Sequence, residues 1–201
     1  QAGYLAVQPN TSVRRPTPAG RKVVTNALRD FRLGRVAPAG EPRRRFKAVS
    51  ERLSELGNRF NHNLLDATDA WSMNLVDAAD VAGLPGSALA LARQEAESRG
   101  ERGWTFTLKA PSYFPFVTHA DSRALRRLIY EAYVTRASET GPHGGRFDNT
   151  AIMNEILTLR REKAALLGFD HYAEYALQTR MAASVEEVRD FLLDLADRSL
   201  P

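Results

Sequence analysis

Apolar residues recur at intervals of three and four along most of the chain, which is the spacing of one face of an α-helix. Two such runs lie in the first third of the sequence. The first predicts a short helix that ends at Gly34, with the apolar positions Val23, Val24, Ala27, Leu28 and Phe31. The second predicts a long helix from about Glu41 to Leu65, with the apolar positions Phe46, Val49, Leu53, Leu56 and Phe60. Because this second stripe is narrow, we expect the long helix to need a partner helix.

Two short segments alternate between apolar and polar residues instead, as half-buried β-strands do. The first places Trp71, Met73 and Leu75 on one face. The second places Trp104, Phe106 and Leu108 on one face and Thr105, Thr107 and Lys109 on the other, and Pro111 is expected to end it. A short turn and a helix ending at Gly100 separate the two segments. We predict that residues 70–76 and 104–109 pair as a small antiparallel sheet.

Helical spacing returns after residue 120. One helix is expected to begin at an N-cap, Asp121 or Ser122, and its apolar positions are Ala124, Leu125, Leu128, Ile129, Ala132 and Tyr133. A loop with three Gly and one Pro, "ETGPHGGRF", follows it. Asp148, Asn149 or Thr150 can cap the next helix, which Gly168 ends. Its expected packing positions are Ile152, Ile156, Leu159, Leu166 and Leu167.

The last two predicted helices are short. Asp170 can cap "HYAEYALQTRM", and Ser184 with Glu187 forms a capping box before Val188, Phe191, Leu192 and Leu195. The fold class is therefore mainly α, a multi-helix protein with one small antiparallel β element. Residues 1–20 contain three Pro and little periodicity, and we expect an extended or disordered lead-in before the helical part, 21–201.

Composition places the chain among globular proteins. Its 201 residues are 43% hydrophobic and 26% charged, and no apolar run approaches the roughly 18 residues of a membrane span. There is no Cys, which excludes disulfides and thiolate metal sites. The N-terminal stretch lacks the pattern of a signal peptide, so we expect a cytoplasmic location. Because the chain starts at Gln1 and stops directly after an amphipathic segment, we expect a fragment of a longer protein.

Charge is distributed unevenly. Residues 1–60 hold 13 Lys and Arg against 4 Asp and Glu, whereas residues 61–201 hold 15 against 20. A basic region from Arg14 to Arg59 could form a helical nucleic-acid-binding module. The alternative is a solvated face on two Arg-rich helices. We favour this alternative, because neither interleaved aromatic residues nor a helix-turn-helix pattern accompanies the charge.

The residues that could carry chemistry form no known catalytic pattern. The four histidines are His62, His119, His143 and His171. No two are four apart, so no helical pair can grip a metal, although His171 and Glu174 could share a helix face. We interpret that pair as an exposed helix start, and His143 as part of a flexible surface loop.

The tyrosines and the catalytic motifs add no site. Tyrosines could serve as polar groups in a cleft, but at helical spacing they are more often the edges of a core. They are Tyr113, Tyr130, Tyr133, Tyr172 and Tyr175. G-x-S-x-G, Walker-type and G-x-G-x-x-G motifs are absent from the sequence. We therefore assign no catalytic, cofactor-binding or metal-binding residue.

Five segments resemble the thimet oligopeptidase family of zinc metallopeptidases, in the family's order. They are "NALRDFRLG", "RLSELGNRFNHNLLDATDAW", "GLPGSALALARQEAESRG", "TLKAPSYFPFVTHADSRALRRLIYEAYVTRASETGP" and "DNTAIMNEILTLRREKAALLGFDHYAEYALQTRMA". The resemblance covers about residues 20–201. It implies a cytoplasmic enzyme that hydrolyses short peptides, built as two helical lobes around a deep channel. In the family, an H-E-x-x-H helix and a downstream Glu hold the zinc, and the Glu of the motif is the general base.

This sequence contains no His-Glu dipeptide, so none of the family's zinc ligands or catalytic residues has a counterpart here. The resemblance implies an N-terminal to middle section of a larger two-lobed peptidase, with part of the channel wall but no complete catalytic domain. We expect zinc in the parent enzyme, no cofactor in this chain and no activity of the chain alone. Expected partners are short peptides, for the parent enzyme, and the missing catalytic lobe, with no membrane. Self-association through exposed apolar faces is also expected.

Overall fold

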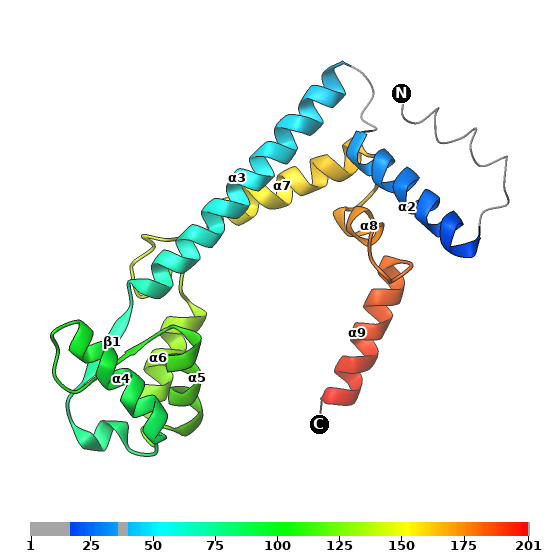
Figure 1. The fold of residues 1–201 in the computed structure, drawn as a ribbon. Helices are drawn as coiled ribbons and strands as arrows, with labels where there is room; N and C mark the ends of the chain where they lie inside the picture. Colours follow the sequence, from blue (N-terminus) through cyan, green and yellow to red (C-terminus); the bar gives the residue numbers. More distant parts are fainter. Residues whose placement is uncertain (1–16, 36–39, 201) are drawn as a thin grey trace. The chain divides into compact units, whose positions relative to one another are not determined.

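A computed structural model describes residues 17–35 and 40–200 (Figure 1). In chain order its elements are α2 (Pro18–Arg35), α3 (Glu41–Asp69), β1 (Ser72–Leu75), η2 (Ala78–Val81), α4 (Gly86–Ser98), β2 (Trp104–Thr107), α5 (Ala110–His119), α6 (Arg123–Val134), α7 (Thr150–Leu166), α8 (Tyr172–Leu177) and α9 (Val185–Ser199). The predicted fold class, helices with one small antiparallel sheet, is confirmed. The chain divides into two compact units: unit 1 is Gln1–Leu53 with Leu157–Pro201, and unit 2 is Ser54–Ile156.

The sheet of unit 2 has the predicted partners. β1 and β2 are antiparallel, with Met73 opposite Phe106 and Leu75 opposite Trp104. Leu75 and Phe106 are buried, as their alternation predicts. The expectation that Thr105 and Thr107 form a polar outer face is wrong, because both are buried.

Hydrogen bonds reduce the desolvation cost of burying the hydroxyl groups of the two threonines of β2. The Thr105 hydroxyl donates to Glu101 Oε2 at 2.6 Å and accepts from Asn74 Nδ2 at 2.9 Å. The Thr107 Oγ1 atom accepts from the Lys109 backbone N–H at 3.4 Å. Buried hydroxyls with such partners avoid most of the desolvation penalty that an unpaired polar group carries. The strand is therefore covered on both of its faces.

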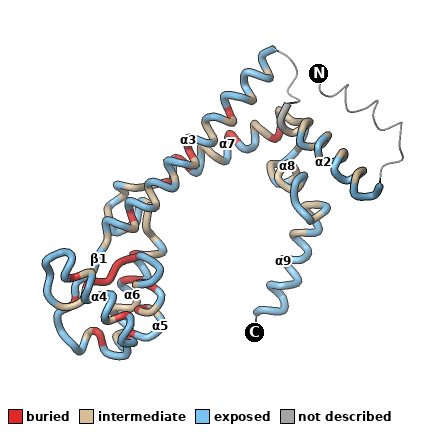
Figure 2. The backbone as a smooth tube through the Cα atoms, in the orientation of Figure 1, coloured by how far each residue is buried: buried red, intermediate tan, exposed pale blue. Residues whose placement is uncertain are grey.

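The core of unit 2 forms where α4 packs on β2 and α5 packs on α6, side by side in Figure 1. Its buried members are Leu75, Val81, Leu84, Ala92, Phe106, Leu108, Tyr113, Phe116, Ala120, Ile129 and Ala132. The ring centroids of Phe106 and Phe116 lie 4.6 Å apart in an edge contact. In Figure 2 a continuous buried stretch follows β2 through this core.

Helix α5 was not predicted from the sequence. Pro111 lies in its first turn, where a helix does not use the backbone N–H that proline lacks. The helix begins one residue earlier, at Ala110, and β2 ends at Thr107, so Pro111 belongs to the helix and does not itself end the strand as expected. Pro115 lies inside the same helix, which made the segment look less helical than it is.

The predicted helix starts are mostly confirmed. Ser122 caps α6 by accepting from the Leu125 N–H, and Ser184 caps α9 by accepting from the Glu187 N–H at 3.1 Å. Asp148 accepts from the Thr150 N–H at 2.9 Å where α7 begins. Asp170 does not cap α8. That helix begins one residue later than expected, with His171 at the N-cap position and no side-chain cap bond.

A buried amide joins the start of α7 to α3 within unit 2. Asn149 is 2% exposed. Its side-chain oxygen accepts from Asn63 Nδ2 at 2.9 Å, and its own Nδ2 donates to the Phe60 carbonyl at 3.2 Å. Its backbone N–H donates to Ala137 O at 3.0 Å. Asn149, one of three predicted caps, therefore holds the end of the Gly-rich loop against the long helix.

In unit 1 the N-terminal half of α3 contacts α7. Arg45 forms an ion pair with Glu162, in which its Nη2 lies 2.7 Å from Oε2. Val49, Leu159 and Ala164 are buried. The partner helix expected for α3 is thus α7.

The first and last helices described in unit 1 are α2 and α9. Helix α2 begins at Pro18, inside the predicted lead-in 1–20, and residues 1–16 lie outside the described residues. Helix α9 has no buried residue and is exposed along most of its length (Figure 2). Its large apolar side chains are 43–62% exposed, namely Phe191, Leu192, Leu193 and Leu195.

Candidate functional site: an arginine-rimmed apolar groove

The histidines do not come together. His62 lies exposed on α3, and His119 lies exposed at the end of α5. Within residues 17–35 and 40–200, no group of three or more His, Asp or Glu could hold a metal ion. These residues therefore do not fit a zinc site, and we derive no chemical step through zinc in this chain.

The pair His171 and Glu174 stands at the start of α8, as interpreted from the sequence. Glu174 lies in the first turn, and its Oε2 accepts from the Asp170 backbone N–H at 3.2 Å. A carboxylate there also suits the partial positive charge of a helix N-terminus. The role that the structure supports for Glu174 is thus to close the first turn of the helix.

His143 is more constrained than the flexible surface loop that the sequence suggested. Its Nε2 lies 3.3 Å from the Ala67 carbonyl of α3, and its ring meets Phe147 edge-on at 5.4 Å. The Gly-rich loop around it contains several turns closed by backbone hydrogen bonds. His143 therefore helps to attach the loop to α3.

Two of the five tyrosines stack in unit 2. The ring centroids of Tyr113 and Tyr133 lie 3.8 Å apart, and the two ring planes are 12° from parallel. The Arg136 guanidinium lies 3.6 Å from the centroid of the Tyr133 ring. Burial raises the pKa of the Tyr113 hydroxyl, and the neighbouring Tyr133 and Tyr130 add to the rise. Tyr113 is a core-edge residue, as expected, and it keeps its proton at neutral pH.

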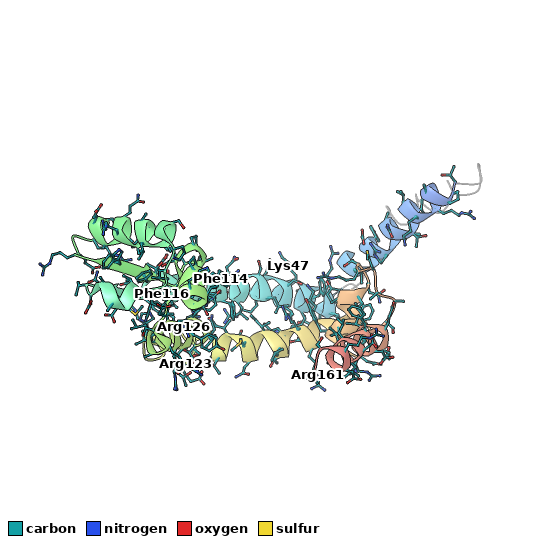
Figure 3. All side chains as sticks on the ribbon, turned by 90° about the horizontal axis from the view of Figure 1, so that it is seen from below. Lys47, Phe114, Phe116, Arg123, Arg126 and Arg161 are labelled. Atoms are coloured by element: carbon teal, nitrogen blue, oxygen red, sulfur yellow. The ribbon has the colours of Figure 1, made fainter. Side chains whose placement is uncertain are left out.

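A groove of about 570 Å³ lies between α5 and α6 in unit 2. Its lining residues are Tyr113, Phe114, Val117, Arg123, Arg126, Arg127 and Tyr130. Phe114, Arg123 and Arg126 are labelled in Figure 3. Aromatic and aliphatic groups with a few polar ones make up the usual lining of ligand sites. The sequence pattern showed the aromatic cluster "PSYFPF" but gave no reason to place arginines beside it.

The three arginines of the groove differ in what they contact. Arg126 donates to the carbonyls of Ala120 and Asp121, which anchors it to the end of α5. Arg127 pairs with Glu131 of its own helix at 2.6 Å. The Arg123 side chain makes no hydrogen bond or ion pair with any described part of the chain. The groove therefore offers at least one available guanidinium beside an apolar wall, which is chemistry for binding a carboxylate.

A second polar group of interest, Lys163 of α7, lies in unit 1. Its Nζ stands 5.2 Å from the Phe46 ring centroid and 5.6 Å from that of Tyr175. Burial lowers the pKa of the Lys163 ammonium. The pKa of the Tyr175 hydroxyl is raised, mainly by burial and to a smaller extent by the nearby Tyr172. Attraction to the Phe46 and Tyr175 rings favours the charged form of the Lys163 amine, whereas burial disfavours that form.

The basic region 14–59 is only partly described by the structure. Several of its charges are neutralised locally, since Arg29 pairs with Asp30, Arg44 with Glu41 and Lys47 with Glu51. Arg14, Arg15 and residues 36–39 lie outside the described residues. Nucleic-acid binding through this region stays a prediction.

None of the described helices combines the length and the apolar character needed to cross a membrane.

Comparison with known proteins shows similarity to peptidases, both in a family model and in individual relatives. Residues 116–201 match the family model of peptidase family M3. The chain is 48% identical to oligopeptidase A of Salmonella typhimurium over 183 residues, which is 91% of this chain and 27% of that protein. It is 46% identical to oligopeptidase A of Haemophilus influenzae over 198 residues, 98% of this chain and 29% of that protein.

A plant protein matches over a similar stretch. The probable cytosolic oligopeptidase A of Arabidopsis thaliana is 39% identical over 188 residues, 90% of this chain and 26% of that protein. The chain thus spans less than a third of the length of these curated relatives. The resemblance predicted from the sequence is confirmed: over most of its length the chain is similar to a section of oligopeptidase A, and residues 116–201 match peptidase family M3.

Proposed function

We propose that the chain is a section of a zinc-dependent metallo-oligopeptidase that hydrolyses short peptides. The single observation that carries this proposal is the 46–48% identity to bacterial oligopeptidase A over nearly the whole chain. Within the parent enzyme the section would form part of the channel wall. Because the sequence has no H-E-x-x-H, it would contribute neither a zinc ligand nor the general base.

The first experiment assays the 201-residue chain with a quenched fluorescent octapeptide, with and without added zinc. We expect no hydrolysis above buffer, because the described residues place no three metal-binding side chains together. Zinc-dependent turnover that a chelator abolishes would show that the chain is not inert. The parent protein encoded by the same gene is the positive control, and it should cleave the octapeptide and lose activity with the chelator.

A second experiment tests the place of this section in the channel. A peptide that carries a benzophenone group would be photolysed with the intact parent protein, and the crosslinked residues would be identified by mass spectrometry. We expect crosslinks within residues 21–201. Crosslinks confined to the rest of the protein would contradict a channel-wall role for this section.

We also propose that the exposed apolar side of α9 is a packing surface for the missing lobe. Phe191 is 62% exposed and Leu192 is 56% exposed, and nothing described in unit 1 buries either side chain. In the isolated chain such a surface favours self-association. Light scattering should show mass increasing with concentration, and Leu192→Glu should reduce that increase. A constant monomer mass at all concentrations would refute this role for α9.

A cytoplasmic location is likewise a proposal, supported by the name of the Arabidopsis relative, probable cytosolic oligopeptidase A. Cell fractionation of the parent protein tests it. Recovery of the protein with the membrane or secreted fractions would contradict it.

A further inference from the structure

The groove between α5 and α6 leaves apolar surface in water next to a finished core. Phe114 is 54% exposed and Tyr130 is 53% exposed. The core behind them is closed, since Phe116 and Ile129 of the same two helices are fully buried. The exposed rings are thus not needed to fill the interior of unit 2. Apolar surface in a concave, polar-rimmed place is typical of a binding site.

The charge of the groove restricts what can bind there. Arg126 and Arg127 lie three and four residues after Arg123, so both neighbour Arg123 on the same side of α6. No Asp or Glu is among the lining residues. Of these three arginines, only Arg127 has a carboxylate partner among residues 17–35 and 40–200, namely Glu131. Like charges at this spacing repel one another, so an occupant with negative charge would relieve the repulsion.

We propose that this groove binds an acidic peptide segment, in which a bulky apolar side chain lies beside one or two Asp or Glu carboxylates. The apolar side chain packs against Phe114 and Tyr130. A carboxylate accepts hydrogen bonds from the Arg123 guanidinium, whose donors have no other partner in the described chain. This role goes beyond the proposed function, because binding here requires neither zinc nor cleavage of the peptide.

A second copy of the chain is a poor occupant of the same groove. In a twofold-symmetric dimer each copy presents the same patch to the other. Two such patches would bring the arginines of both α6 helices together, with no carboxylate among the lining residues to separate them. Charge complementarity therefore favours a partner of opposite charge.

The test measures binding of a fluorescein-labelled peptide, Gly-Glu-Phe-Glu-Leu-Gly, to the 201-residue chain by fluorescence anisotropy. The matched control peptide has Gln in place of both Glu. We expect the acidic peptide to bind more tightly, and Arg123→Glu to weaken its binding about tenfold by replacing attraction with repulsion. Phe114→Ala removes apolar contact and should weaken binding about fivefold.

The control variant is Arg161→Glu, which makes the same change of net charge on an exposed arginine outside the groove (Figure 3). We expect it to bind the acidic peptide like the unaltered chain. Equal loss of binding in Arg123→Glu and Arg161→Glu would show unspecific attraction and overturn the proposal. Equal affinity for the Glu and Gln peptides would also overturn it.

Two further readouts keep the result interpretable. Tryptophan fluorescence checks that unit 2, which contains the groove and both Trp71 and Trp104, is folded in each variant. Sedimentation checks for dimers. Self-association that Phe114→Ala abolishes, together with no peptide binding, would identify a second copy as the occupant and refute the acidic peptide. Because no turnover is measured, these outcomes do not depend on peptidase activity.

Discussion

Replacing Asn149 with Asp would test whether the buried amide fixes the loop to α3. The substitution keeps the size of the side chain and exchanges Nδ2 for an oxygen. One carboxyl oxygen can still accept from Asn63 Nδ2, which now lies 2.9 Å from the amide oxygen. The other oxygen faces the Phe60 carbonyl, which accepts from Asn149 Nδ2 at 3.2 Å. An ionised carboxylate cannot donate to that carbonyl, but a protonated carboxyl can.

The expected size follows from burial. The Asn149 side chain is 2% exposed, and burial with a carbonyl neighbour raises the pKa of a carboxyl by about two to three units above its ordinary value near 3.9. Each unit corresponds to about 1.4 kcal/mol, so the variant should lose about 3–4 kcal/mol of unfolding free energy at pH 7. The folded state holds the proton more tightly than the unfolded state. The loss is therefore small below about pH 4 and grows as pH rises through the folded-state pKa.

Urea unfolding followed by tryptophan fluorescence measures this difference. Both tryptophans, Trp71 and Trp104, lie in unit 2, so the signal reports on the unit that contains Asn149. The control is Asn61→Asp, the same chemical change at an exposed position of α3 whose side chain makes no hydrogen bond within the described residues. A loss that is the same at pH 4 and pH 7, or equal in both variants, would refute the reasoning.

Three further substitutions test the core and the surface separately. Gly103→Ala adds a Cβ that overlaps the Leu75 carbonyl oxygen at a φ of +87°, and urea unfolding should show a loss of about 2–4 kcal/mol. Phe116→Ala empties a site that is 0% exposed, and the same assay should show a loss of about 3–5 kcal/mol. Arg45→Gln removes the hydrogen bond and charge that hold the pKa of Glu162 below its ordinary value, so an NMR titration should find that pKa higher in the variant.

For each of these three variants, either a matched control variant or an outcome that would contradict the prediction can be named. Gly100→Ala changes a glycine with a φ of +70° and open space around it, so it should cost less than Gly103→Ala. Phe114→Ala removes an exposed ring, so it should cost far less than Phe116→Ala. Equal losses within either pair would contradict the packing argument. An unchanged titration of Glu162 in Arg45→Gln would show that the ion pair does not form in solution.

Strong periodicity explains why the longest elements could be predicted. The stripe on α3 placed Val49 and Leu56 inside, and both are 1% exposed. The prediction of α3 ended at about Leu65, four residues before the observed end at Asp69, because the last turn has few apolar residues to mark it. The apolar periodicity was therefore sufficient to predict a helix such as α3, in which one face is buried.

Elements that depend on tertiary packing were harder to predict. A proline after a strand reads as a stop, but Pro111 also suits the first turn of α5. Alternation along β2 indicated one apolar face, whereas Thr105 and Thr107 are buried because other elements cover the second face as well. Nothing in a six-residue pattern shows which distant segment will provide that cover.

The candidate site was even less accessible from the sequence. The spacing of Arg123, Arg126 and Arg127 could have indicated a basic helix face, since it follows the helical repeat. The groove also requires α5 to pack beside α6, and α5 was not predicted. His143 was misjudged for a similar reason, because its contact with the Ala67 carbonyl joins positions 76 residues apart.

Helices α5 and α6 of unit 2 carry both fully buried and half-exposed aromatic or aliphatic residues. Phe116 and Ile129 face the closed core, while Phe114 and Tyr130 of the same helices remain about half exposed. Folding free energy comes mainly from the first pair, because burial of apolar area is what stabilises the unit. The second pair can therefore be substituted with little effect on unfolding but a measurable effect on peptide binding. Such a separation would support recognition by the groove, because a residue with only a structural role could not change binding without also changing stability.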